Sequence, residues 1–455
     1  MREEQHDFSR GSMLGNILRL SLPLIVAQFI NVLYNIVDRM YIGRIPGADS
    51  AALTGVGVAF PIITAITAFS LLVGTGGAPL CSIARGKGDE KRAEHIMGNS
   101  FLMTLVMGVV LLGMGLLVKE PLLYALGASP ATFGYANDYI SIYLLGTVFV
   151  MISLSMNGFI NCQGFAKMGM LTVLIGAVLN LILDPVFIFV FHMGVKGAAI
   201  ATVLSQMVSA LWVVRFLTGK KTLLRLRLSS MKPDFPCMGE ILSLGLSGFI
   251  MAATNCGVQV VCNVTLQSYG GDVYVGIMTI VNSVREVLSV PASGLTQGTQ
   301  PILGFNYGAG EYTRVKSGIK IMSVICMVYT TIAWVITLLI PQVFICLFNG
   351  GEELMELGVP AMRIYFFGFC FMSLQFAGQS VFTGLGKAKQ AIFFSLLRKA
   401  VIVIPLTLWL PRVAGLGATG VFLAEPISNF IGGTACFVTM LCVVLPELSR
   451  GGKRP

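Results

Sequence analysis

The chain has 455 residues, of which 55% are hydrophobic and only 11% are charged, and its mean hydropathy is +0.82. Soluble globular domains carry about 25% charged residues, so the composition excludes that class and indicates a multi-pass membrane protein. The formal net charge of +10 does not indicate nucleic-acid binding, because the basic residues fall in short loops, as is usual for cytoplasmic loops beside anionic lipid. We therefore expect membrane lipid as a partner and no nucleic acid.

Twelve apolar segments are long enough to cross about 30 Å of hydrocarbon as helices. This number predicts an all-α integral membrane protein. The charged stretch Met1–Gly11 has no cleavage signature after the first span, so no removable signal peptide is expected. In chain order, the predicted spans are 14–38, 50–76, 94–118, 134–156, 164–190, 196–217, 238–262, 273–298, 315–341, 358–382, 390–412 and 416–446.

Basic residues are concentrated in the loops on one side of these spans. That side holds pairs such as Lys220 and Lys221, whereas the other side has few basic residues and carries an acidic loop with Glu352, Glu353 and Glu356. Because cytoplasmic loops are the more basic ones, both termini are expected in the cytosol and the acidic loop outside.

Internal repetition divides the spans into two groups of six. Gly15–Leu22 resembles Gly239–Leu246, and further matches at an offset of 220 to 224 follow in the same order, among them Pro185 with Pro405. An even number of spans per repeat gives two parallel six-helix lobes around a central cleft, opened to alternate sides by rocking. The expected domains are a cytoplasmic tail (1–13), an N-lobe (14–217), a basic cytoplasmic linker (218–236), a C-lobe (237–446) and a second tail (447–455).

A polar stripe interrupts the first span. Its side chains follow one another at spacings of 3, 4 and 3 and therefore share one helix face. A carboxylate and three amides are costly in hydrocarbon unless they face a polar interior or water, so this face is predicted to line the transport route. The stripe consists of Gln28, Asn31, Asn35 and Asp38.

The two repeats differ in their acids. In the second repeat, Asn31 and Asn35 correspond to Asn255 and Gln259, but Cys262 stands where the first repeat has Asp38. Likewise, Ile404 stands at the position of the fifth-span acid Asp184, which shares a helix face with Asn180 four residues earlier. The first half therefore carries two intramembrane carboxylates that the second half lacks.

These carboxylates suggest a cation or proton site. Burial and mutual repulsion disfavour two ionised carboxyl groups, and a proton or Na⁺ relieves both penalties, with Asn180 and Thr202 as neutral oxygen ligands. The alternatives are structural. Asp38 would be an interfacial residue paired with Arg39, and Asp184 would satisfy backbone groups freed by Pro185.

The second half has its own intramembrane charges. Glu286 would attract a cationic substrate or, alternatively, form an interhelical ion pair. No role is assigned to Arg398, Lys399 or Glu425. The sequence has no H-E-x-x-H and no phosphate-binding loop, so neither enzyme activity nor ATP-driven transport is expected. Ten scattered cysteines without C-x-x-C, and three separated histidines, predict free thiols, no metal centre and no cofactor.

Several of these motifs together resemble the multidrug and toxic compound extrusion (MATE) transporters. They are the first-span Asp38 followed by Tyr41-Ile-Gly43, the turn Arg85-Gly-Lys-Gly-Asp89, and Asn180 with Asp184-Pro185. The segment Pro291…Gln300-Pro301-Ile302…Asn306-Tyr307-Gly308 is similar to the bacterial MepA-like branch of that family. The resemblance covers essentially the whole chain.

The resemblance implies a V-shaped pair of lobes in a bacterial plasma membrane, a monomer, and antiport of lipophilic or cationic drugs against H⁺ or Na⁺. It matches Asp38, Asn180, Asp184 and Thr202 to the family's ion-coupling cluster. It also matches Gln28, Asn31, Tyr34 and Asn157 to positions near the drug cavity, to which the repeat adds Asn35, Asn255 and Gln259. A lipid-linked precursor flippase of the same architecture is the main alternative, and a membrane enzyme or receptor is a third.

Overall fold

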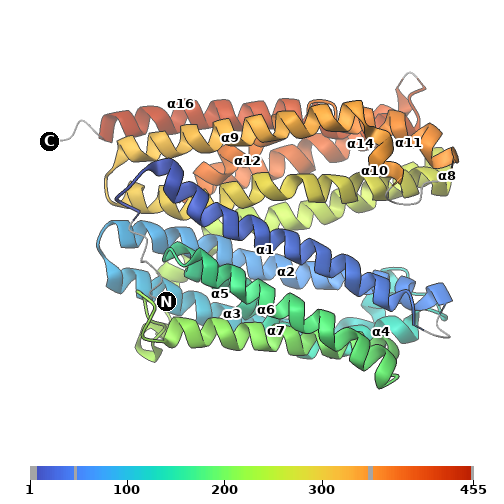
Figure 1. Cartoon of the computed structure of the whole chain (residues 1–455), viewed down its shortest axis with the longest axis horizontal. Coiled ribbons are helices and arrows are strands. Elements are labelled where there is room, and N and C mark those ends of the chain that lie inside the picture. Colours follow the sequence, from blue (N-terminus) through green and yellow to red (C-terminus); the bar gives the residue numbers. More distant parts are fainter. Residues whose placement is uncertain (1–7, 46–48, 347–351, 414, 452–455) are drawn as a thin grey trace. The chain divides into compact units, whose positions relative to one another are not determined.

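The structure is a computed structural model that describes residues 8–45, 49–346, 352–413 and 415–451. The outer parts of both predicted tails, with Arg2, Lys453 and Arg454, lie outside the described residues. Within these ranges every regular element is a helix, which confirms the predicted all-α class (Figure 1). The chain divides into two compact units. Unit 1 takes in residues 22–249, and unit 2 takes in residues 8–21 and 250 onward.

Unit 1 consists of long helices that follow one another in chain order and appear in blue to green in Figure 1. A bend of 57° at Gly146 separates α4 from α5, so one predicted span is built from two helices. The helices are most of α1 (Met13–Ile42), α2 (Asp49–Gly86), α3 (Glu90–Ala125), α4 (Phe133–Leu145), α5 (Thr147–Cys162), α6 (Ala166–Pro185), η1 (Val186–Val190), α7 (Gly194–Thr218), η2 (Leu228–Met231) and the first turns of α8 (Phe235–Gly308).

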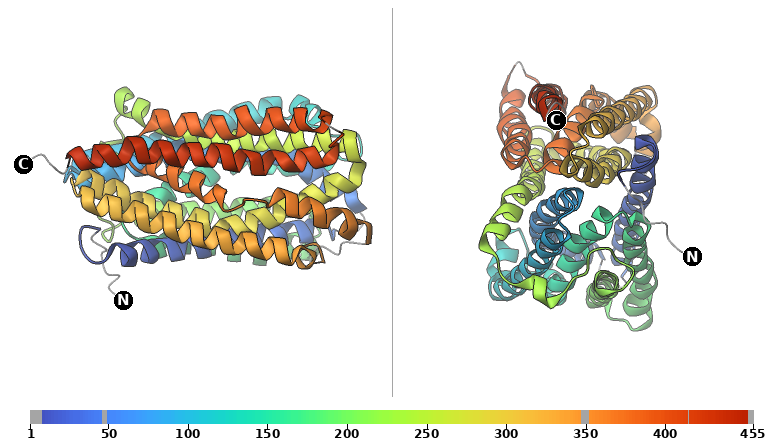
Figure 2. Two further views of the ribbon diagram at one scale, coloured as in Figure 1. Left: turned by 90° about the horizontal axis from the view of Figure 1, so that it is seen from above. Right: turned by 90° about the vertical axis from the view of Figure 1, so that its left-hand side faces the viewer.

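Unit 2 contains the rest of α8 and the helices that follow it. Figure 2 shows these yellow-to-red helices lengthwise in one view and end-on in the other. They are α9 (Tyr312–Leu339), α10 (Pro341–Cys346), α11 (Glu352–Tyr365), α12 (Phe371–Gly384), α13 (Ala388–Leu396), η3 (Leu397–Val403), α14 (Ile404–Trp409), η4 (Leu410–Arg412), α15 (Ala418–Ser428), η5 (Asn429–Gly433) and α16 (Thr434–Gly451).

The predicted spans reappear in these helices, though several are interrupted. In the described part of the chain, nine helices are long and apolar enough to cross a membrane, and the bent pair α4 and α5 adds a tenth. The 74-residue α8 covers two predicted spans that meet at Gly271, where the backbone leaves the helix at φ 67° and ψ −164°. The predicted span 358–382 is split between α11 and α12. Twelve membrane crossings are consistent with this arrangement.

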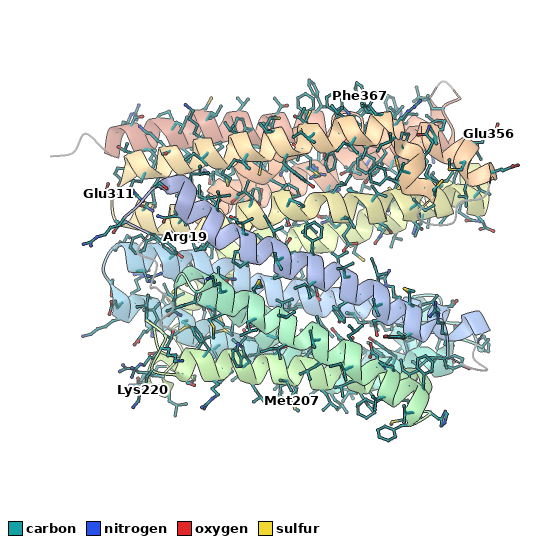
Figure 3. The ribbon with its side chains drawn as sticks, in the orientation of Figure 1. Arg19, Met207, Lys220, Glu311, Glu356 and Phe367 are labelled. Atoms are coloured by element: carbon teal, nitrogen blue, oxygen red, sulfur yellow. The ribbon has the colours of Figure 1, made fainter. Side chains whose placement is uncertain are left out.

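Apolar side chains on the outside of each unit fit a lipid environment. Leu117 in unit 1 is 85% exposed and Phe367 in unit 2 is 63% exposed, and Figure 3 shows Phe367 pointing away from unit 2. The charged residues Glu311 and Glu356 lie at opposite ends of unit 2 in the same figure. A hydrophobic exterior between charged ends is the pattern expected of a bundle that spans a bilayer.

The segment predicted as a linker, 218–236, is packed against unit 1. Leu224 and Leu226 are buried in the core formed by α2, α3, α5 and α7. The buried Gln163, at the end of α5, accepts hydrogen bonds through its side-chain oxygen from the Thr222 hydroxyl (2.6 Å) and from the backbone N–H of Leu224 (2.8 Å). The segment is therefore ordered by specific buried contacts.

Candidate functional site

The candidate site lies in unit 1, where α6 brings two polar residues to its C-terminal end. Asn180 and Asp184 are one helical turn apart and both are buried. The amide nitrogen of Asn180 lies 3.2 Å from Oδ1 of Asp184 and 3.3 Å from Oγ1 of Thr202 on α7. One side chain thus connects the carboxylate to the neighbouring helix. Immediately after Pro185, which has no backbone N–H, the chain winds into the π-helical turn η1.

Asp38 of α1 completes the group. Its carboxyl lies close enough to that of Asp184 to interact directly. Three oxygens of this group are buried without a hydrogen-bond partner: Oδ1 of Asp38, Oδ2 of Asp184 and Oδ1 of Asn180. Buried polar atoms are normally satisfied, and two adjacent carboxylates repel each other. The arrangement is therefore suited to a bound proton or a small cation.

The structural alternative for Asp38 was a pairing with Arg39. Its sequence neighbour Arg39 places its guanidinium over the ring of Phe60, 4.4 Å from the ring centroid, and no ion pair joins Asp38 to Arg39 among the described side chains. For Asp184, the alternative of a kink residue accounts for the position beside Pro185. It does not account for the second carboxyl nearby or for the unpartnered oxygens.

Two tyrosines beside the carboxylates were missed by the sequence reasoning. Tyr139 and Tyr143 of α4 are buried, and their rings stack with centroids 6.1 Å apart. Tyr139 lies close to Asp38 and Thr202, and Tyr34 of α1 lies close to both carboxyls. The signal was present in the sequence as two tyrosines four residues apart in an apolar span, which places them on one helix face.

The other predicted residues of unit 1 do not join this group. Along α1, the Asn35 side chain donates to the backbone carbonyl of Asn31 (2.7 Å), and Asn31 itself is exposed. Gln28 is partly buried two turns earlier on the same helix. Asn157 of α5 donates to the backbone carbonyl of Gly169 (3.3 Å) on α6, and its Oδ1 is buried without a partner.

The residues predicted in the second half all lie on one long helix. Asn255, Gln259 and Glu286 are all exposed on α8 of unit 2. Among the described residues Glu286 forms no ion pair, so the alternative of an interhelical ion pair for this residue is not observed. The intramembrane acid that does form ion pairs is Glu425, which is buried with Arg398 and Lys399.

A group of possible metal ligands that the sequence did not suggest occurs at the start of α8. The ligand atoms of His95, Asp234 and Cys237 lie within 4.8 Å of one another. Asp234 accepts from the backbone N–H of Cys237 (3.4 Å) and contacts the His95 ring (3.0 Å), so it caps α8 and fastens it to α3. These residues are distant in sequence, which is why their spacing gave no metal-binding signal.

Comparisons with known proteins agree with this fold. The family model MatE matches residues 23–186 and 248–409. The chain is 25% identical to the multidrug export protein MepA of Staphylococcus haemolyticus and 24% identical to that of Staphylococcus saprophyticus. These alignments cover 95% of both chains in the first case, and 98% of this chain and 96% of the relative in the second. A solved structure of a MATE protein in complex with MaL6 superposes with a TM-score of 0.91 at 23% identity, over 98% of this chain and 99% of the other.

Proposed function

The chain belongs to the MatE family. We propose that it is a secondary active multidrug exporter that exchanges drugs for H⁺ or Na⁺. The observation that carries the proposal is the carboxyl pair Asp38 and Asp184, in which each acid has one buried oxygen without a hydrogen-bond partner. Such a pair binds a cation or proton when it faces one side of the membrane and loses it when it faces the other. The chain is a transporter and not an enzyme.

The coupling step follows from the charge of this group. With both carboxyls ionised and one oxygen of each buried without a partner, the site is costly, and a proton or Na⁺ stabilises it. Ion binding therefore shifts the equilibrium between the two access states, and a drug that prefers the opposite state is exported as the ion enters. The side chain of Asn180 donates both to Asp184 and to Thr202, and so holds the carboxylate in place relative to α7.

Both candidate ions fit the donor set. A proton would be shared between the carboxyls of Asp38 and Asp184. Sodium would take carboxylate oxygens together with the unpartnered Oδ1 of Asn180 and the hydroxyl of Thr202, all of which are hard oxygen ligands. Substrate efflux in proteoliposomes, with ΔpH and ΔNa⁺ imposed separately, identifies the ion. If neither ΔpH nor ΔNa⁺ drives efflux of the substrate, the proposed antiport is rejected.

The proposed substrates are lipophilic and cationic small molecules. The relatives are multidrug export proteins, and this supports drug export over the flippase alternative. Proposed contacts are polar or aromatic side chains of α1, α5 and α8, which would orient varied ligands by hydrogen bonds and a single acidic group. They are Gln28, Asn31, Tyr34, Asn35, Asn157, Asn255, Gln259 and Glu286.

We propose that the protein is a monomer in a bacterial plasma membrane and that both of its termini lie in the cytosol. The basic segment around Lys220 and Lys221 supports this orientation. Single cysteines placed in that segment, in a cysteine-free background, are expected to react with a membrane-impermeant reagent only after the cells are opened. Labelling of these cysteines in intact cells would mean that the segment faces the outside, contrary to the proposed orientation.

A further inference from the structure

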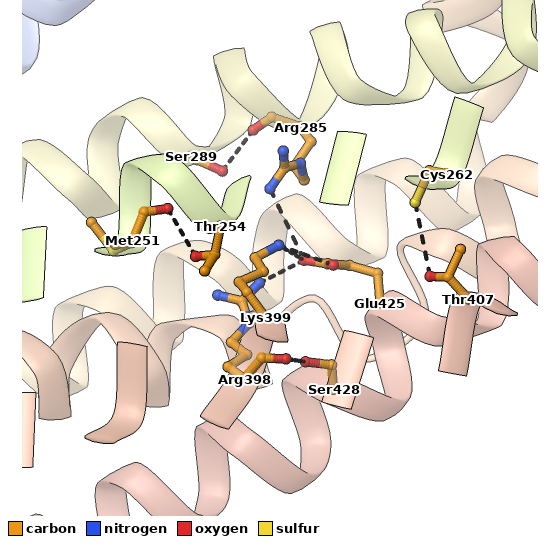
Figure 4. Close-up of polar contacts among 10 residues, drawn as sticks. All are labelled: Met251, Thr254, Cys262, Arg285, Ser289, Arg398, Lys399, Thr407, Glu425 and Ser428. Carbon is orange, nitrogen blue, oxygen red and sulfur yellow. Dashed lines mark hydrogen bonds and ion pairs between the residues drawn. The ribbon is translucent and has the colours of Figure 1, made fainter. Parts of the chain in front are cut away.

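Unit 2 contains a buried cluster of charges that the proposed coupling does not use. Glu425 of α15 accepts hydrogen bonds from Nη2 of Arg398 (2.5 Å) and from Nζ of Lys399 (3.1 Å to each oxygen), as Figure 4 shows. Arg285 of α8 approaches the same carboxylate from the other side, with its Nη1 4.0 Å from Oε1. We refer to these four residues as the cationic cluster.

The cationic cluster has more positive than negative charge. Among the described residues, Glu425 is the one carboxylate within ion-pair distance of these three basic side chains. With Lys399 charged the excess is two positive charges, and with Lys399 neutral it is still one. The Nε–H groups of Arg285 and Arg398 are also buried without a hydrogen-bond partner. Charges and donors of this kind require a compensating partner when they are removed from water.

The cluster occupies the place in the second repeat that the ion site occupies in the first. The offset of 223 residues that aligns Gly194 with Gly417 also aligns Thr202 with Glu425. Arg398 and Lys399 lie just before the position that corresponds to Asn180 at the offset of 220 that aligns Pro185 with Pro405. The first repeat gathers two acids at this place and the second gathers three bases, so the two sites have opposite charge.

The backbone holds the cluster in a fixed geometry. Arg398 and Lys399 belong to the π-helical segment η3, which changes the normal helical hydrogen bonding. The carbonyl of Arg398 also accepts from the hydroxyl of Ser428 (3.1 Å), one turn after Glu425. The backbone that carries the basic side chains is thereby fastened to α15, which carries Glu425. π-Helical turns inside α-helices occur frequently at functional sites.

We propose that the cationic cluster is a binding site for a monovalent anion, either chloride or the carboxylate group of an organic molecule. Arg285 is the accessible end, since its side chain is 29% exposed whereas those of Arg398, Lys399 and Glu425 are exposed by 9%, 7% and 5%. The anion approaches the partly exposed guanidinium of Arg285 and neutralises the excess charge that Glu425 leaves. This site goes beyond the proposed antiport and does not depend on it.

Substitutions of Arg285 and of Glu425 are expected to change anion binding in opposite directions. Removing Arg285 takes away the accessible donor while Glu425 keeps Arg398 and Lys399, so the protein is expected to fold and to bind the anion at least about tenfold more weakly. Removing the charge of Glu425 takes away the competing internal anion and is expected to tighten binding by about tenfold. A purely structural ion-pair network would show no dependence on anion in either case.

The test measures chloride NMR line broadening by the purified full-length protein in detergent, at constant Na⁺ and ionic strength. Arg285→Gln is expected to abolish most of the broadening and Glu425→Gln to increase it. Arg363→Gln, an exposed arginine elsewhere in unit 2, and Asp184→Asn, in unit 1, are expected to leave it unchanged. If the Arg285→Gln variant broadens the chloride line as much as the wild type does, the proposal is overturned, whether or not Glu425→Gln folds.

Competition separates the two sources of the anion. If acetate or benzoate displaces chloride at lower concentration than bromide does, the site prefers a carboxylate, and if bromide competes better, it prefers a halide. Efflux of a labelled aromatic carboxylate from proteoliposomes, lost in Arg285→Gln, would make the anion a transported substrate. Loss of ion-driven drug efflux in Asp184→Asn without loss of anion binding keeps this result distinct from that for unit 1.

Discussion

Asn180 donates its side-chain N–H to the carboxylate of Asp184, one helical turn further along α6, across 3.2 Å. The same nitrogen lies 3.3 Å from Thr202 on α7, so a neutral amide fixes the carboxylate relative to the neighbouring helix. The amide oxygen of Asn180 is left without a partner and is available to a cation. A residue that only stabilised the helix kink at Pro185 would not need this second connection.

Neutralising either acid is expected to abolish coupling. Asp184→Asn and Asp38→Asn keep the shape of the side chain but remove the charge that a proton or Na⁺ compensates, so gradient-driven efflux of ethidium from proteoliposomes is expected to fall to the level of empty vesicles. Asp138→Asn is the control, since Asp138 lies at the surface and pairs with Lys196 at 3.5 Å. Wild-type efflux in both neutralised variants would remove these residues from the coupling site.

The hydroxyl of Thr202 is expected to affect ion binding without being essential for folding. Thr202→Val keeps the volume but loses the oxygen that Asn180 contacts, leaving one donor unsatisfied at a cost of about 1–3 kcal/mol. The concentration of coupling ion required for half-maximal efflux is expected to rise about tenfold or more.

Thr202→Ser retains the hydroxyl and is the matched control, with an expected ion dependence close to that of the wild type. Equal ion dependence in the Val and Ser variants would show that this oxygen plays no part in the site.

The fold was largely readable from the sequence because apolar length determines which segments cross a membrane. Its interruptions were harder to predict. The break of α8 at Gly271 falls between the predicted spans 238–262 and 273–298, but Gly146 bends the predicted span 134–156 by 57°. Gly146 is a single glycine in an apolar run, so its local sequence does not distinguish it from glycines that continue a helix. The segment 218–236 was predicted as a linker from its charge, although Leu224 and Leu226 are buried in unit 1.

The candidate site was readable in part. Spacing and the repeat identified Asp38, Asn180 and Asp184, because charged residues in an apolar span are costly enough to require a reason. Tyr139 and Tyr143 escaped notice since tyrosine is common in membrane proteins and carries no charge. The contacts of Glu425 were also out of reach, because its partners lie 26, 27 and 140 residues away in sequence.

Close helix packing inside unit 1 is expected to be intolerant of one added methyl group. A Cβ at Gly245 of α8 would lie 1.7 Å from the carbonyl oxygen of Leu72 on α2, an atom that cannot move away alone. Gly245→Ala is expected to destabilise the protein by about 1–3 kcal/mol or more, measured as a lower unfolding temperature in detergent. Gly239→Ala, in the same helix with no atom within 4 Å of its Cβ, is the control. Equal unfolding temperatures for the two variants would contradict the packing.

The contact of Gln163 with the segment 218–236 is expected to protect that segment from proteolysis. Gln163→Ala removes the acceptor that Thr222 and Leu224 share. The Thr222 hydroxyl keeps the carbonyl of Leu224 as an acceptor (2.9 Å), but the buried backbone N–H of Leu224 loses its partner, at a cost of about 1–3 kcal/mol. The segment should then detach more often, so trypsin is expected to cleave after Lys220 or Lys221 at least about tenfold faster in the purified protein. Lys220 lies at the end of unit 1 in Figure 3. Equally slow cleavage of the Gln163→Ala variant and the wild type would mean that other contacts hold the segment in place.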